Sequence, residues 1–415
     1  MRILLISVGT RGDMEPFVAL GLRLQARGHD ICCAFPEQFR SLAEAHGLAF
    51  ASLGSQFMEL LDSADGRAAM GGASGWKKVM GTLRLAVRQK AANQELLLHQ
   101  QAIVDDFVPE HILYNGKATY PMLWVLDHPG QATFISPVPY MHYVRGYSHV
   151  AFHRDLGPFL NQLSFRLADF GLITTLKMSR KWLGLPRRHP RAALRRVVQE
   201  SPTIYTISPT LFPRPDYWPP QRQVLGFYAS ETTASYEPSP DLRVFLSRHP
   251  KILFISFGSM LNADPAGKTR LLLDILDRHQ IPAIINTAAG GLQEPDDYER
   301  ARLHFVRNVP YSWLFPRVSA VIHHGGSGTT HMGLRHGCPT LIVPHIVDQY
   351  AWAQIVHQQG AGPAGLPISK LRPRVLEARI LDLWQNPAYP ARAGAIAQAM
   401  VAEDFSDTLF RMIEG

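Results

Sequence analysis

Residues 319–330, with the sequence SAVIHHGGSGTT, combine the groups that proteins use to bind an anion. An apolar stretch leads into His323 and His324, three glycines follow within four positions, and two threonines open a predicted helix. Glycines let a ligand approach the backbone closely, and the free amides at a helix N-terminus attract negative charge. A tight turn around a buried histidine is the alternative interpretation, but the position between an apolar strand and a helix favours a phosphate site.

A polar pair, Asp348 and Gln349, follows this segment by about twenty residues. It comes after a strand predicted over 340–343 and opens the next predicted helix. Because the carboxyl ends of parallel strands lie at one edge of a sheet, both segments are expected at the same edge. Alone, the pair would be read as a helix cap; next to a phosphate site, its carboxylate and amide suit the hydroxyls of a sugar.

A third candidate, Asp13, lies in the turn that follows the apolar run 2–8. Read from the residues alone, it is the N-cap of a helix that extends to Gly28.

Two regions of alternating strands and helices must position these residues. They span 1–210 and 244–390, and seven prolines between Ser208 and Pro240 mark a linker over 211–243. Such alternation predicts an α/β protein of two doubly wound, Rossmann-like parallel-sheet domains that face a cleft.

The composition excludes several classes of protein. With 46% hydrophobic and 18% charged residues, the 415-residue chain is globular, and its three cysteines form no Cys-x-x-Cys pair. No signal peptide or spanning helix is apparent, so a cytoplasmic protein is expected. The net charge is +8, and much of it lies in the segment from Lys177 to Arg196. This segment contains eight basic residues and no acid. That segment is either a solvated surface or a weak contact with the anionic inner face of the membrane; no module for binding nucleic acid accompanies it.

The segment 323–330, together with Asp348 and Gln349, resembles the donor signature of family 1 glycosyltransferases, which have the GT-B fold. The resemblance extends to FISFGSM at 254–260 and NVPYSWLFP at 308–316. The start of the chain, GTRGDMEPF at 9–17, is most similar to sterol 3-β-glucosyltransferases and glycopeptide-antibiotic (vancomycin-type) glycosyltransferases.

This resemblance implies roles for individual residues. The first domain would bind the acceptor, the second would bind the nucleotide sugar, and the C-terminal helix over 391–415 would return to the first domain. Asp13 would be the catalytic base, and Tyr140 and Tyr143 would contact the acceptor. The residues expected to bind the nucleotide sugar are Gly12, Gly258, Ser259, Val309, His324, Gly326, Ser327, Gly328, Thr329, Asp348 and Gln349.

The implied activity is inverting transfer of a sugar, by default glucose from UDP-glucose, to a hydroxyl of a hydrophobic acceptor such as a sterol-like lipid, polyketide or phenol. No cofactor is expected, and since the sequence has no Asp-x-Asp motif, no metal is expected either. Sterol enzymes commonly carry histidine and alanine where this chain has Tyr311 and Ser327, so the acceptor stays open.

Other functions remain as alternatives. A TDP-deoxysugar could replace UDP-glucose, and the chain could be a non-catalytic protein that binds a nucleotide sugar or a lipid surface. A nicotinamide enzyme or a sugar-nucleotide epimerase would share the βαβ units, but the turn 9–12 lacks the G-x-G-x-x-G spacing of the former.

Overall fold

A computed structural model describes residues 1–56, 59, 76–152, 155–186, 189–230, 236–258, 260, 262, 264–288 and 290–415, those at 76–89 and 191 by their backbone only. These residues form two compact units. The first unit contains the described residues up to Ser230 and, in addition, Asp404–Gly415. The second unit contains the described residues that lie between Ser230 and Asp404.

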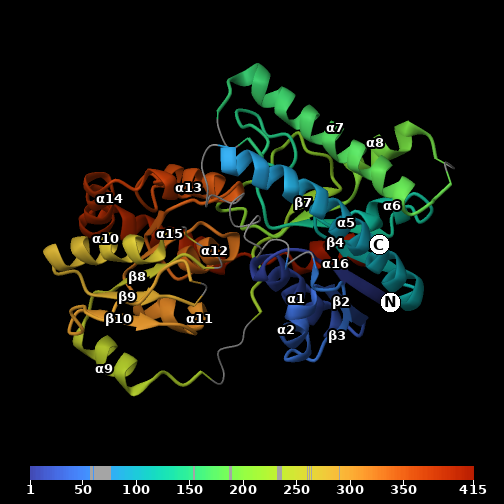
Figure 1. The fold of residues 1–415 in the computed structure, drawn as a ribbon. Coiled ribbons are helices and arrows are strands. Elements are labelled where there is room, and N and C mark those ends of the chain that lie inside the picture. Colours follow the sequence, from blue (N-terminus) through green and yellow to red (C-terminus); the bar gives the residue numbers. More distant parts are fainter. Residues whose placement is uncertain are drawn as a thin grey trace. The chain divides into compact units, whose positions relative to one another are not determined.

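The first unit is a parallel sheet between two layers of helices (Figure 1). Its described strands follow the order β3-β2-β1-β4-β5-β6-β7. The main elements, in chain order, are β1 (Arg2–Ile6), α1 (Arg11–Gln25), β2 (Asp30–Phe35), α2 (Arg40–Glu44), β3 (Ala49–Ser52), α5 (Trp76–Phe107), β4 (His111–Tyr114), α6 (Tyr120–Trp124), β5 (Ala132–Ser136), α7 (Pro158–Trp182), α8 (Arg191–Glu200), β6 (Thr203–Tyr205), β7 (Arg222–Val224) and α16 (Ser406–Glu414).

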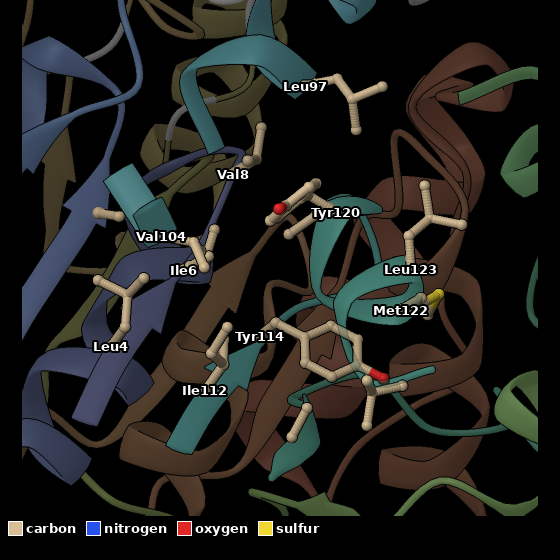
Figure 2. Close-up of a cluster of buried hydrophobic side chains, with 14 of the residues drawn as sticks. Leu4, Ile6, Val8, Leu97, Val104, Ile112, Tyr114, Tyr120, Met122 and Leu123 are labelled. Carbon is tan, nitrogen blue, oxygen red and sulfur yellow. The ribbon is translucent and has the colours of Figure 1, made fainter. Parts of the chain in front are cut away.

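Strand β1 shows how the apolar sequence builds this core. Its side chains alternate, so Leu4 and Ile6 face the layer of α5–α8 and contribute to the cluster in Figure 2. Ile3 and Leu5 face the opposite layer, where they pack with residues of α1 and α16. A strand buried on both faces requires an uninterrupted apolar run, which explains the sequence ILLI.

The second unit is a smaller parallel sheet, with described strands in the order β10-β9-β8-β11-β12. Helices α10 and α14 pack on one face, and α9 and α11 pack on the other. Its main elements are α9 (Pro240–Arg248), β8 (Leu253–Ser256), α10 (Pro265–Arg278), β9 (Ala283–Asn286), β10 (Leu303–Val306), α11 (Tyr311–Leu314), β11 (Ala320–His323), α12 (Ser327–Arg335), β12 (Thr340–Ile342), α13 (Asp348–Gln358), α14 (Pro373–Gln385) and α15 (Ala388–Val401).

In the range 211–243, expected to be a linker, the described residues up to Ser230 belong to the first unit. This range contains β7 of the first sheet, and Leu211, Phe212 and Trp218 are buried in the first unit. Helix α9 of the second unit already begins at Pro240. The prolines are compatible with this structure because β7 is an edge strand, where a neighbouring proline removes no central hydrogen bond of the sheet.

The segment 391–415, expected as one returning helix, is divided between the units. Helix α15 stays with the second unit and buries Ala393, Ile396 and Met400. Only α16 belongs to the first unit, where Leu409 and Ile413 join the core beside α1. Glu414 anchors this helix, accepting hydrogen bonds from Arg27 at 2.7 and 2.9 Å.

Across the helices described here, none is both long and apolar enough to cross a bilayer.

Candidate functional site

The second sheet brings together the segments that the sequence marked for a phosphate and a sugar. Strands β8, β11 and β12 are neighbours and run parallel. Their carboxyl ends lead into Gly258, His324 and, after β12, the loop before Gln349. These segments therefore meet at one edge of the sheet, as predicted.

The imidazole of His324 is enclosed by two glycine backbones. A methyl group on Gly258, which has a φ of +55°, would collide with the ring of His324. A methyl group on Gly326 would lie 2.5 Å from Nε2 of the same ring. These positions must be glycine for steric reasons, and the ring, whose residue is 8% exposed, has little freedom to move. Its Nδ1 is buried and has no hydrogen-bond partner among the described residues.

Helix α12 starts directly beside this ring. Gly326 is its N-cap, and Ser327, Gly328 and Thr329 form the first turn. The first helical hydrogen bond runs from the amide of Thr330 to the carbonyl of Gly326 at 2.9 Å, so the preceding amides have no partner within the helix. These residues are half-buried and their amides can accept an anion.

The histidines of this edge are neutral. Burial, with a smaller contribution from His345, lowers the pKa of His324 to about 3. Burial likewise lowers the pKa of His345 to about 4, although its hydrogen bond to the carbonyl of Val343 at 2.8 Å opposes the shift. This bond places the proton of His345 on Nδ1 and leaves Nε2 as an acceptor; Nε2 is buried and has no partner in the part of the chain that the structure describes. His345, which follows the same strand end as Asp348, is not among the residues predicted from the sequence.

Asp348 and Gln349 have different surroundings. Asp348 is half-exposed in the first turn of α13. Gln349 is 3% exposed, and its Oε1 accepts hydrogen bonds from the amides of His345 (2.7 Å) and Ile346 (3.1 Å). Its Nε2 donates to Sδ of Met260 at 3.3 Å. The side chain of Gln349 thus holds the loop after β12, whereas Asp348 is half-exposed.

The remaining predicted donor residues are dispersed. Val309 is buried, 7% exposed, among side chains on one face of the second sheet. Ser259 lies outside the described residues. Gly12 belongs to the first unit and is exposed, so the structure does not group it with the others.

In the first unit, Asp13 lies at the start of α1, but it is not the N-cap. Thr10 occupies that position, and Asp13 is the third residue of the helix. Its Oδ2 accepts hydrogen bonds from the amide (2.8 Å) and the hydroxyl (3.2 Å) of Thr10. Lys117 contacts Oδ2 at 3.2 Å and Oδ1 at 3.3 Å. Oδ1 is therefore the less engaged oxygen, and the side chain of Asp13 stays 22% exposed.

A buried asparagine positions both members of this ion pair. Asn115 donates from Nδ2 to Oγ of Ser7 at 3.0 Å and accepts at Oδ1 from the amide of Lys117 at 3.2 Å. Ser7 in turn donates to the carbonyl of Asp13 at 2.8 Å. Sequence reasoning missed Asn115 and Lys117, yet the segment Asn-Gly-Lys directly follows an apolar strand and could have been found by the rule that located the donor segments.

The two tyrosines proposed for the acceptor differ in exposure. Tyr140 is 5% exposed, stacked on Tyr147 with ring centroids 4.4 Å apart and in edge contact with Phe212. Tyr143 is 37% exposed and packs edge-on against Phe165. Of the two, Tyr143 has a ring accessible to a ligand.

Two surface hollows lie apart from these residues. One of about 620 Å³ in the second unit is lined by α9 and the segment 313–319, and one of about 340 Å³ in the first unit lies between α5 and α6. Neither is lined by a residue predicted for the site. The candidate site is therefore defined by the hydrogen bonds and helix-start amides at the sheet edges, and not by either hollow.

Two parallel-sheet units with such carboxyl-edge segments define the GT-B class of fold. The chain superimposes on the structure of the Streptomyces sp. SF2575 glycosyltransferase SsfS6 complexed with thymidine diphosphate, with a TM-score of 0.61 and 17% identity. The match covers 100% of this chain and 99% of that one.

Family models and curated relatives agree with this class. Residues 3–107 match the glycosyltransferase family 28 N-terminal domain, and residues 297–411 match the erythromycin biosynthesis protein CIII-like C-terminal domain. The sterol 3-beta-glucosyltransferase UGT80A2 of Arabidopsis thaliana is 30% identical over 97% of this chain, which spans 64% of that relative. The O-mycaminosyltylonolide 6-deoxyallosyltransferase of Streptomyces fradiae is 29% identical over 97% of this chain and 94% of its own length. The chain belongs to the family of GT-B glycosyltransferases that includes these enzymes.

Proposed function

We propose that the protein transfers a sugar from a nucleotide sugar to a hydroxyl of a hydrophobic acceptor, with inversion at the anomeric carbon. The observation that carries this proposal is the enclosed, neutral His324 beside the free amides of α12. Such a group of donors suits a diphosphate, whose charge increases when it leaves the sugar.

For the donor, we propose that His324 and the amides at 326–329 bind the phosphates, and that Asp348 binds hydroxyls of the sugar. We propose that the buried side chain of Gln349 holds the loop after β12 in place for the donor, because its Oε1 accepts two hydrogen bonds from that loop. UDP-glucose is the proposed donor, in keeping with the glucosyltransferase UGT80A2, and a TDP-deoxysugar is the alternative, in keeping with the thymidine diphosphate bound to SsfS6. We propose that no metal and no cofactor take part.

For the acceptor, we propose that Oδ1 of Asp13 takes the hydroxyl proton as the oxygen attacks the anomeric carbon. The bond from that carbon to the phosphate oxygen breaks, and the nucleoside diphosphate leaves with the electron pair. Lys117 would be a positioning residue that orients the carboxylate, since it contacts both oxygens of Asp13. Because Asp13 and His324 belong to different units, we propose that neither unit alone transfers sugar.

The proposed compartment is the cytoplasm, which suits three cysteines that are all free and buried. Among the basic residues at 177–196, Lys177, Lys181, Arg195 and Arg196 are exposed. They would give the segment a weak, salt-sensitive attraction to an anionic membrane.

The test is turnover measured by mass spectrometry, with UDP-glucose and TDP-glucose each supplied with a sterol, a polyketide aglycone and a phenol. Wild-type protein is expected to form a glycoside whose anomeric configuration is inverted relative to the donor, and Asp13→Asn is expected to form far less. If the protein binds the nucleotide sugar but forms no glycoside with any acceptor, the non-catalytic alternative replaces this proposal. A product that retains the donor configuration would contradict the single displacement.

A further inference from the structure

Helix α7 exposes a stripe of large apolar side chains. The exposed fractions are 76% for Phe159, 48% for Leu160, 51% for Leu167, 68% for Phe170 and 44% for Met178. At 100° per residue these five side chains fall within about one third of the helix circumference. We call them the α7 outer face. Single exposed apolar residues are common on proteins, but a contiguous set indicates an interaction surface.

The opposite side of α7 already supplies the packing that the fold needs. Asn161, Phe165, Leu176 and Ser179 are buried there, and Leu176 belongs to the core on that side of the first sheet. Helix α8 packs alongside α7 (Figure 1). Since the inner side holds the helix in place, the apolar character of the outer face is not explained by the folding of this unit.

Positive charge borders the outer face. Arg166, Lys177 and Lys181 are exposed, and Lys177, five turns after Phe159, lies on the same line along the helix. The acid of α7, Asp169, is turned toward α8, where its carboxylate accepts a hydrogen bond from Gln199 at 2.9 Å. On α8 itself, Arg195 and Arg196 are also exposed.

We propose that the α7 outer face inserts into the surface of an anionic lipid membrane. Aromatic and aliphatic side chains on one face, with lysine and arginine beside them, characterise helices that lie in the plane of a membrane interface. The cations would attract the anionic head groups while the apolar side chains enter the acyl boundary. Membrane binding by charge alone is abolished by salt. If the α7 outer face inserts, part of the vesicle binding should persist at high salt.

The experiment measures flotation of the full chain with vesicles of phosphatidylcholine alone and of an equal mixture with phosphatidylglycerol. Wild-type protein should float with the anionic vesicles. The variant F159S/F170S should lose at least about tenfold in vesicle affinity, because two inserted aromatic side chains are removed. The matched control is V244S/V375S, which alters two valines of the second unit that are 44% and 41% exposed and should bind as wild type does. The charge variant K177Q/K181Q should bind less at low salt.

Unchanged flotation of F159S/F170S with a normal thermal transition would overturn the proposal, as would equal binding of wild type to neutral vesicles. Complete loss of wild-type binding at high salt would reduce the contact to charge alone and overturn insertion. Light scattering that shows a dimer abolished by F159S/F170S would make a second copy the occupant instead. Because flotation requires no turnover, this proposal and the proposed sugar transfer fail separately.

Discussion

The carboxyl edges of the two sheets differ in charge: one carries an ion pair, and the other carries neutral groups. The candidate base of the first unit is charged, and both members of its ion pair reach solvent, Asp13 at 22% and Lys117 at 50% exposure of the side chain. The edge of the second unit carries buried, neutral imidazoles and backbone amides. Burying an ion is costly unless it is paired, so an ionised carboxylate is kept at the surface while dipoles can be enclosed.

This contrast suggests why a single reaction would use both edges. A base must hold a negative charge before it can accept a proton, and its cation keeps that charge in position. A diphosphate brings its own charge, which the fixed amides and neutral histidine of the proposed site would stabilise. Each edge can be tested by changing one of its own groups.

The largest effect is expected from Asp13→Asn. The amide keeps the shape of the carboxylate but cannot accept the proton, so kcat should fall roughly 10²–10⁴-fold. Calorimetry should find the affinity for the nucleotide sugar unchanged. As a control, Asp30→Asn alters a carboxylate of the same unit that is 62% exposed and should leave kcat as it is. Near-normal turnover of Asp13→Asn would remove this residue from the chemistry.

His324→Ala should come next. Losing a donor to charged phosphate should weaken the binding of both UDP and UDP-glucose by about 10- to 100-fold. Gly326→Ala should produce a loss of the same kind, because its methyl group would displace the ring of His324. Gly394→Ala, whose methyl group meets no atom within 4 Å, is the matched control. If His324→Ala binds UDP normally, the phosphate site lies elsewhere.

The neighbours Asp348 and Gln349 should separate in their effects. Asp348→Ala should weaken UDP-glucose by about tenfold and free UDP little, since its proposed partners are sugar hydroxyls. Gln349→Ala leaves two loop amides without their acceptor, so it should weaken both ligands equally and lower the free energy of unfolding by about 1–3 kcal/mol. Thermal unfolding together with both affinities distinguishes the roles. A selective loss of UDP-glucose in Gln349→Ala would return this residue to the sugar site.

The smallest effect is expected from pH. The pKa of His324 is lowered to about 3 by burial, so the ring stays neutral between pH 8 and 6 and gains no proton that would attract phosphate. The affinity for UDP-glucose, whose phosphates do not titrate in this range, should therefore be flat. Calorimetry at several pH values measures it. Binding that tightens steadily toward pH 6 would show that a protonated histidine takes part.

Local sequence rules correctly placed the segments of the proposed donor site at one sheet edge, because each segment follows a short apolar strand. His324, Gly326 and Asp348 could be assigned to one edge from strand order alone, before any coordinate was known. The direction in which each side chain points could not be predicted by the same rule. Nothing in the sequence distinguishes the accessible Asp348 from Gln349, whose amide is turned toward the loop before it.

Contacts between segments far apart in the sequence could not be predicted either. Lys117 pairs with Asp13 across 104 positions of sequence, and no local pattern records that pairing. The division of the segment 391–415 between the units could not be predicted for a related reason. Helices α15 and α16 are both helical in pattern, but the cores that receive them lie in different units. Similarly, the edge position of β7, which makes the prolines beside it acceptable, is a property of the whole sheet.

The return of the chain to its first unit has a consequence for biosynthesis. Leu409 and Ile413, which are translated after the second unit, complete the same core as Phe17 and Leu24, which are translated before it. The ribosome therefore releases every residue of the second unit before the first unit has its full core. A nascent chain halted before residue 404 would expose the apolar flank of α1, a surface suited to chaperones, until Glu414 reaches Arg27.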